Sequence, residues 1–248
     1  MIKTDLNKIK ASSIIFIFCL FSIVSISCSE DKAEAIEETE TPTDDTKQEE
    51  EEEPVEPEKK CSLNPKDGLL ILEAESFDLK GKWRIKEDEK ASGGKYIEYY
   101  GYNSYNAQNL DHEISIKFNI PEAKNYLVKW YMRQPDHAEG DKSNDVWMYF
   151  PGNIGYAWVN NESVVLEHYE KFVSRGKVEF TYGGALDLHN PKSSSWFTVR
   201  FPEPGEYTLK ICARSEEFQL DKMVLSSGIT NDEAMAQSKD VTETIICE

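Results

Sequence analysis

The sequence predicts an all-β fold, a two-sheet β-sandwich formed by residues 61–248. Three observations predict it. Apolar and polar residues alternate with a period of two in many short segments, Gly and Pro separate these segments, and helical periodicity is nearly absent. Many short strands separated in this way are typical of sandwiches and barrels. A stretch of this length buries one core, so we expect one folded domain.

Eight segments carry the strand pattern, and turn residues such as Gly93-Gly94, Pro121 and Pro204-Gly205 separate several of them. Residues 167–174 are expected to form a helical turn. The predicted strands, in chain order, are 69–75, 96–100, 112–120, 125–133, 145–150, 196–201, 207–213 and 219–225.

Residues 1–27 read as a targeting signal that lies outside the fold. Lysines precede an apolar run over residues 14–26, and the small Ser27 precedes Cys28. This segment resembles a bacterial lipoprotein signal, which implies that Cys28 is the lipidated first residue of the mature chain. Ser25 departs from the leucine usual at that position. An ordinary cleaved signal and an uncleaved anchor are the alternatives.

Residues 28–60 are expected to form a disordered acidic stalk. Residues 29–60 hold 15 acidic and 4 basic side chains, a net charge of −11 out of −18 for the whole chain. Such a segment cannot bury enough apolar area to offset the entropy of ordering it. Its start, Ser29-Glu30-Asp31, resembles the surface-export signal of Bacteroidetes lipoproteins. The resemblance implies an outer-membrane protein that contacts the membrane only through its lipid, although a spacer without an address is an alternative.

The remaining cysteines fit a compartment outside the cytoplasm. Cys61 and Cys247 lie at the two ends of the domain, and the termini of a domain often lie close together, so we predict a disulfide between them. Alternation places Cys212 on the face opposite Leu209 and Ile211, which indicates a free, packed thiol. The net negative charge of the domain disfavours nucleic acid as a partner.

Two segments at opposite ends of the domain resemble the first and last strands of carbohydrate-binding modules of families 6 and 35. They are 72–77, which contains Glu73-Ala74-Glu75, and 218–225, which contains Asp221. Two similar turns between them, 114–123 and 201–209, agree with that order. The resemblance implies a jelly roll of the galactose-binding-domain type and a structural Ca²⁺ held by Glu73, Glu75 and Asp221. The alternative is that these acids point into solvent.

Sugar recognition needs flat apolar faces beside hydrogen-bonding groups, and the tyrosine-rich and asparagine-rich segment 99–106 offers both. The family resemblance implies a loop site made by Tyr100 or Tyr102, by Trp196 or His189, and by Gln219 in place of an asparagine. Arg133 belongs to a polar insertion able to hold hydroxyl, sulfate or uronate groups, or is tied to an aspartate. Trp130 and Trp147 lie in strand patterns and are expected to pack in the core.

These predictions lead to one expected function and two alternatives. The expected function is non-catalytic polysaccharide binding at the cell surface, which serves neighbouring glycan-uptake or glycan-degrading proteins. One alternative is a polysaccharide lyase that uses His189, Tyr182 and Arg175, although no nucleophile or paired-carboxylate motif is visible. The other is an adhesin that binds a protein, because fold does not determine function.

Overall fold

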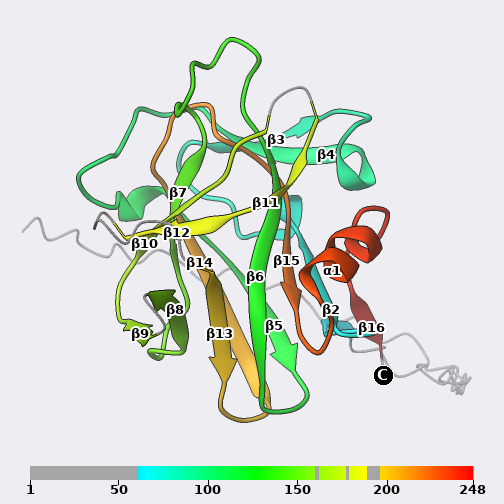
Figure 1. Ribbon diagram of the computed structural model, residues 1–248. Helices are drawn as coiled ribbons and strands as arrows, with labels where there is room; N and C mark the ends of the chain where they lie inside the picture. Colours follow the sequence, from blue (N-terminus) through cyan, green and yellow to red (C-terminus); the bar gives the residue numbers. More distant parts are fainter. Residues whose placement is uncertain (1–60, 160–161, 177–178, 189–195, 248) are drawn as a thin grey trace, which may run out of the picture. The chain divides into compact units, whose positions relative to one another are not determined.

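Two antiparallel sheets face each other across one core in the computed structural model of the chain (Figure 1). The structure describes residues 61–247 apart from 160–161, 177–178 and 189–195. The predicted signal, the lipidation site Cys28 and the acidic stalk lie outside the described residues. Within the described part, no helix combines the length and apolar composition needed to cross a membrane.

The larger sheet runs in the order β3-β4-β15-β6-β13-β8-β9, with β11 also paired to β6 and β2 also paired to β15. In Figure 1, β6 runs through the middle of the view with β13 on one side and β15 on the other. The strands are β2 (Leu69–Glu73), β3 (Trp83–Glu87), β4 (Lys95–Tyr99), β6 (Lys124–Arg133), β8 (Gly155–Val159), β9 (Glu162–Leu166), β11 (Thr181–Gly183), β13 (Phe197–Phe201) and β15 (Gln219–Ser226).

The smaller sheet runs in the order β12-β10-β7-β14-β5. Consecutive long strands alternate between the two sheets, since β5, β7 and β14 belong to the smaller sheet while β6, β13 and β15 belong to the larger one. This alternation is the connectivity of a jelly roll. The strands are β5 (Glu113–Ile120), β7 (Asp145–Tyr149), β10 (Glu170–Val173), β12 (Ala185–Asp187) and β14 (Gly205–Ala213).

The core lies between the sheets and is rich in aromatic rings. Trp130 is fully buried, and its ring centroid lies 4.5 Å from that of Phe172 and 5.1 Å from that of Phe218. Trp130 therefore packs in the core as predicted. Trp147 is also buried but lies on the outer face of the smaller sheet, because its neighbours Val146 and Met148 are the ones that point into the core.

All eight predicted strands are present, so the β-sandwich is confirmed, while three details of the prediction were wrong. The first strand ends at Glu73, and residues Ala74–Ser76 form a 3-10 turn. Residues 167–174 form no helical turn, because Glu170–Val173 is strand β10. A helix, α1 (Asn231–Ser238), follows β15 and begins with a capping box between Thr230 and Glu233.

The two ends of the described chain meet in a small strand pair. Strands β1 (Cys61–Leu63) and β16 (Ile245–Cys247) are antiparallel, and Cys61 stands directly opposite Cys247. Cys61 is disulfide-bonded, and this register is the one that the predicted bridge requires. Cys212 is a buried free cysteine, and burial raises the pKa of its thiol to about 11.

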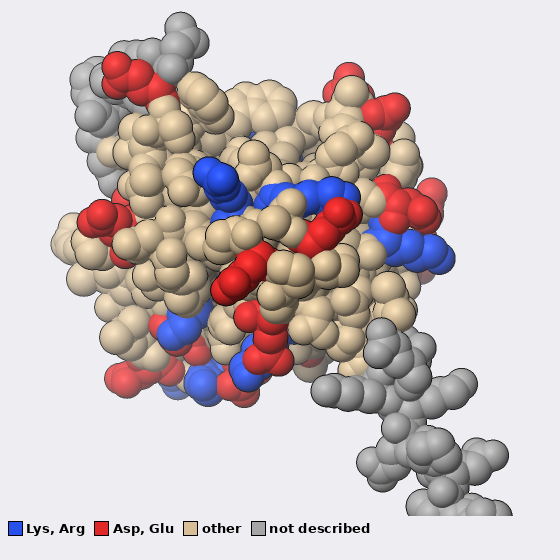
Figure 2. All heavy atoms as spheres, turned by 90° about the horizontal axis from the view of Figure 1, so that it is seen from below, with Lys and Arg blue, Asp and Glu red and all other residues tan. Residues whose placement is uncertain are grey.

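Figure 2 shows the end of the sandwich that carries the β5–β6 and β13–β14 turns, where acidic and basic side chains are interspersed. Exposed pairs such as Lys117–Glu206, at 2.8 Å, and Lys124–Glu122 balance charge locally. Pairs of this kind contribute at most about 1 kcal/mol each.

Candidate functional site

The outer face of the larger sheet carries most of the polar and aromatic side chains of interest. Alternation along β6 sends Trp130 and Met132 into the core. The residues between them, Lys129, Tyr131 and Arg133, therefore point to the opposite, outer face. Tyr131 packs there with residues of β2, β15 and α1 in a second, smaller apolar cluster.

A polar row crosses this outer face at the end of β6. Arg84, Glu98, Gln219 and Arg133 stand opposite one another on β3, β4, β15 and β6. Arg84 Nε donates to Glu98 Oε1 at 3.1 Å, and Gln219 Nε2 donates to Glu98 Oε2 at 3.1 Å. Arg133 donates to Gln219 Oε1 at 2.9 Å and to Asp88 Oδ2 at 2.7 Å. Cross-strand hydrogen bonds thus hold the whole row.

Two of the residues predicted to contact glycan, Arg133 and Gln219, belong to this row. Both are largely buried, and their polar groups are engaged by neighbouring side chains. The guanidinium of Arg133 also lies 4.5 Å from the ring centroid of Phe180 and 5.2 Å from that of Tyr96. Arg133 is tied to an aspartate, as one of the two sequence interpretations held, but that aspartate lies in the distant 88–94 loop.

The three acids predicted to bind calcium gather around the turn at Ser92 and Gly93. Glu73 Oε1 accepts a hydrogen bond from Ser92 Oγ at 2.6 Å, and Asp221 Oδ1 accepts one from Ser92 N at 2.8 Å. A β-carbon added at Gly93, where φ is 61°, would lie 3.6 Å from Glu75 Oε1. A bulge in β15 between Leu220 and Lys222 accompanies the placement of Asp221 beside this turn.

The chemistry of this acidic cluster fits a hard cation. Glu73 Oε2 and Glu75 Oε2 are buried without a hydrogen-bond partner. Burial raises the pKa of Glu73 and of Asp221 to about 7, because charged carboxylates lose hydration there. Oxygen donors of this type suit calcium. The Lys222 ammonium, which donates to Ser92 Oγ at 3.0 Å, already offsets part of the charge.

Within the described residues, no three acidic, histidine or cysteine side chains are arranged as a closed metal-binding group. A calcium ion would therefore need backbone carbonyl or water oxygens in addition to the carboxylates. The calcium site remains a prediction.

A pocket of about 790 Å³ opens beside this cluster. Its walls come from the 89–93 loop, from residues 179–182 and from the segment around α1. Asp221 and the rings of Tyr131, Phe180 and Tyr182 line it. The Tyr131 and Tyr182 ring centroids are 5.4 Å apart. Pockets of this volume that combine aromatic walls with a few polar groups are typical ligand sites.

The other predicted glycan residues lie in separate places. Tyr100 is 46% exposed, and its ring lies beside Arg84, at 4.9 Å, at one end of the polar row. Tyr102 is 90% exposed. Trp196 is 53% exposed and lies under the Lys129 ammonium, at 4.8 Å, and neither residue lines the pocket. His189 lies outside the described residues. The described residues of the predicted loop site do not gather at one place, and Tyr100 and Trp196 lie at separate points of the larger sheet's outer face.

The sequence pattern did not single out Phe180 or Trp158 as ligand contacts. Both have a signal that could have found them. Phe180-Thr181-Tyr182 spaces two aromatic residues two positions apart, and so does Tyr156-Ala157-Trp158, in the pattern of a strand with rings on one face. Each strand is short, and β8 and β11 were absent from the predicted set.

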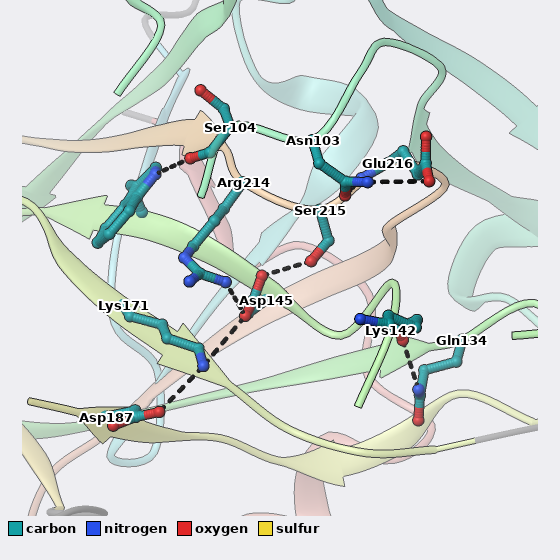
Figure 3. A network of polar contacts seen from close by, with 11 residues as sticks. Asn103, Ser104, Gln134, Lys142, Asp145, Lys171, Asp187, Arg214, Ser215 and Glu216 are labelled. Atoms are coloured by element: carbon teal, nitrogen blue, oxygen red, sulfur yellow. Dashed lines mark hydrogen bonds and ion pairs between the residues drawn. The ribbon is translucent and has the colours of Figure 1, made fainter. Parts of the chain in front are cut away.

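The outer face of the smaller sheet carries a different polar network, centred on the buried Asp145 (Figure 3). Arg214 and Ser215 both donate to this carboxylate. Lys171 lies 3.3 Å from Asp145 and 3.0 Å from Asp187, and so links β7 with β12. Two cations and a hydroxyl group thus neutralise and bind one buried acid.

A loop covers the aromatic ring on this smaller face. Trp147 Nε1 donates to the Ser104 carbonyl at 2.9 Å, and the Arg214 guanidinium lies 5.0 Å from the Trp147 ring. Asn103 and Glu216 exchange two hydrogen bonds of 2.9 Å that fix the same loop to the β14–β15 turn (Figure 3). This network closes the face around Trp147 and leaves its ring 7% exposed.

No protein-family model matches the chain, and neither does any curated protein. Solved carbohydrate-binding modules are similar to it at low identity. The C-terminal family 6 module of LamC, a marine laminarinase from Zobellia galactanivorans, has 16% identity and a TM-score of 0.41, over 64% of this chain and 99% of the module.

Two other solved structures have comparable values. The family 35 module from Clostridium thermocellum has 17% identity and a TM-score of 0.37, over 63% of this chain and 98% of the module. The family 26 β-(1,4)-mannanase with a family 35 module from Podospora anserina has 12% identity and a TM-score of 0.40, over 67% of this chain and 29% of that protein. These values are too low to transfer a ligand to this chain.

Proposed function

We propose that the chain binds polysaccharide without cleaving it, at the pocket on the outer face of the larger sheet. One observation carries the proposal: three aromatic side chains, Tyr131, Phe180 and Tyr182, line a pocket of about 790 Å³ that also holds acidic, basic and hydroxyl groups. Apolar ring faces cover the C–H faces of sugars, and the polar groups meet sugar hydroxyls. Binding of this kind is reversible and needs no reacting group.

The described residues of the lyase alternative do not favour catalysis. In a lyase, Tyr182 would have to abstract a proton, but burial raises the pKa of this phenol above its usual value. Its hydroxyl already donates to Asn231 Oδ1 at 3.2 Å. Arg175 is exposed, and His189 lies outside the described residues.

Calcium is proposed as a structural ion that holds the 88–94 loop against β2 and β15. Glu73, Glu75 and Asp221 would supply carboxylate oxygens to it. Because Ser92 and Asp221 also line the pocket, the ion would stiffen one pocket wall from behind. It needs no contact with the sugar.

The proposed setting is the cell surface, with the chain anchored to the outer membrane by a lipid on Cys28. The acidic residues 29–60 would act as an extended stalk, since like charges repel along the chain. Captured glycan would then pass to neighbouring uptake or degrading proteins. Replacement of the lipid-bearing residue, Cys28→Ala, should release the protein from the membrane fraction, whereas an unchanged membrane fraction would contradict this setting.

The binding proposal is tested by affinity gel electrophoresis against laminarin, β-mannan, β-galactan and xylan. We expect retardation on at least one gel and no new reducing ends or unsaturated products. Ala236→Trp, at an exposed position of α1 that lines the pocket, should abolish the retardation by filling the pocket. Gln237→Trp is the matched control, because this residue is exposed on the same helix outside the pocket lining.

The other outcomes point to the other functions. Product formation would favour the lyase. Absence of retardation on every gel would contradict glycan binding and favour the adhesin.

A further inference from the structure

A ladder of rings and cations follows β6 along the outer face of the larger sheet. The Arg133 guanidinium lies 4.5 Å from the Phe180 ring centroid, and the Tyr131 ring lies 5.4 Å from that of Tyr182. The next outward residue of β6, Lys129, has its ammonium 4.8 Å from the Trp196 ring centroid. We call these three contacts the rungs of the ladder. The first two rungs line or border the pocket, and the Lys129–Trp196 rung lies outside its lining.

The third rung continues onto the β8–β9 hairpin. Strands β13 and β8 pair Phe197 with Ala157, and both of these residues point into the core. Continued by one residue, this register places Trp196 opposite Trp158, and alternation places both on the outer face. These two rings are 53% and 56% exposed, and the other three tryptophans of the chain are at most 7% exposed. Two exposed tryptophans side by side on a sheet form an aromatic platform, here called the Trp158–Trp196 platform.

Polar groups flank the platform. Ser163 of β9 stands opposite Trp158, and Thr198 stands opposite Tyr156 in the neighbouring row. The Lys129 ammonium reaches Trp196 while it donates to the Gly184 carbonyl at 2.6 Å. Ring faces with hydroxyl groups beside them suit a sugar chain better than a purely apolar partner.

The pocket and the platform belong to one continuous surface. Outward residues of β6 repeat about every 6.7 Å, so its three rungs span about 13 Å. Trp158 lies two strands away from β6, which adds about 10 Å across the sheet. A single sugar in the pocket leaves this platform bare, whereas a longer chain reaches it.

Resting on the proposed function, we infer that the site takes an internal stretch of an extended polysaccharide, which runs from the pocket along β6 to the Trp158–Trp196 platform. The ligand class is a polymer recognised along its length. A monosaccharide or a chain end would use the pocket alone.

Fluorescence and affinity together test this inference on the full chain. Acrylamide quenching reports on the platform, because Trp158 and Trp196 are the exposed tryptophans. A retained polymer, such as laminarin or β-mannan, should protect the fluorescence from quenching, and the matching trisaccharide should protect it much less. Trp158→Ala and Trp196→Ala should each weaken polymer binding about tenfold and leave trisaccharide binding unchanged.

Val164→Ala is the matched control for these variants. Val164 lies on the same hairpin and is 41% exposed. Its cross-strand partner Ala157 points into the core, so Val164 lies on the inner face of the sheet, whereas Trp158 lies on the outer face. The control should bind polymer as the parent chain does. All three side chains are exposed, so all three variants should keep the melting temperature of the parent chain.

Each result has a definite consequence. The extended site is overturned if polymer and trisaccharide bind with equal affinity, or if both tryptophan variants bind polymer as the parent chain does. The pocket proposal then still holds if Ala236→Trp abolishes binding. Absence of binding to every polysaccharide overturns the proposed function itself, and the extended site falls with it.

Discussion

The outer faces of the two sheets carry similar residues, but one face is closed and the other is open. On the smaller sheet, Trp147 and Arg214 lie under a loop, and the cations surround the buried Asp145. On the larger sheet, Trp196 is half exposed beside Lys129, and a pocket opens next to the cations. Aromatic and basic residues therefore do not by themselves mark a binding face. The two faces differ in whether a loop of the chain covers the aromatic rings.

The largest effect expected from this comparison is on the closed face. Asp145→Ala would leave the buried Arg214 guanidinium without its carboxylate partner, whereas Lys171 would keep Asp187. Breaking a buried ion pair in this way typically costs about 3–5 kcal/mol. We expect a loss of that size in the free energy of unfolding, measured by urea denaturation.

The same variant separates stability from binding. At temperatures where Asp145→Ala remains folded, its polysaccharide affinity should equal that of the parent chain, because the proposed glycan site lies on the other sheet. Asp141→Ala, an exposed change in the preceding loop, should alter neither property. A binding defect in folded Asp145→Ala would mean that the closed face takes part in recognition.

A change on the open face should affect stability and binding together. Arg133→Met would leave Asp88 and Gln219 without their guanidinium partner and would remove the cation beside Phe180. We expect a loss of about 2–4 kcal/mol in unfolding free energy and weaker glycan retardation.

Arg84→Met is the matched control for this change, at the other end of the same row. The Arg84 side chain is 48% exposed, so its ion pair contributes at most about 1 kcal/mol. Equal losses of unfolding free energy in the two variants would show that Arg133 contributes no more to the row than Arg84 does.

Removal of divalent cations tests the proposed calcium site in the acidic cluster beside the pocket. If calcium binds the acidic cluster, added calcium at about 100 times its Kd should stabilise the fold by about 2.7 kcal/mol, and a chelator should reverse this. The double variant Glu73→Gln, Asp221→Asn should lose the response, measured as the melting temperature with and without calcium.

Asp240→Asn is the matched control for the calcium response. Asp240 is exposed and lines the same pocket, whereas the hydrogen bonds of Ser92 to carboxylates go to Glu73 and Asp221, so replacement of Asp240 should leave the response intact. A melting temperature indifferent to chelator, together with a metal-free mass in native mass spectrometry, would exclude the calcium site.

The long buried strands were readable from the sequence because alternation is a local signal. The segment over 112–120, for example, alternates buried and more exposed residues along nearly its whole length, as strand β5 does in the structure. The short edge strands were not readable. Strand β9 has four exposed residues out of five and so lacks a one-sided apolar pattern.

The candidate site was harder to predict, because it depends on register. Glu73, Glu75 and Asp221 were chosen from a family resemblance, and they do gather at one turn. The partnership of Gln219 with Arg133, and the place of Trp196 opposite Trp158, follow from which strands pair and where. Local sequence does not fix cross-strand neighbours, so no pattern within one segment could reveal them.

The smallest expected effect is on the melting temperature at acid pH, and it is tested with one carboxylate from each face. The Lys90 backbone N–H and the Arg133 guanidinium lower the pKa of Asp88 on the open face. On the closed face, burial would raise the pKa of Glu113, but hydrogen bonds from Tyr169 and Lys210 lower it overall. A carboxyl with a lowered folded pKa stabilises the fold above its unfolded pKa, and this stability is lost as the pH falls through the folded value.

Asp88→Asn and Glu113→Gln should therefore each flatten the fall in melting temperature between about pH 4.5 and pH 2. Only Asp88→Asn should also weaken glycan retardation at neutral pH, because Asp88 holds Arg133 beside the pocket wall at Phe180. If both variants, or neither, changed retardation, the proposed distinction between an open binding face and a closed structural face would fail for this pair of carboxylates.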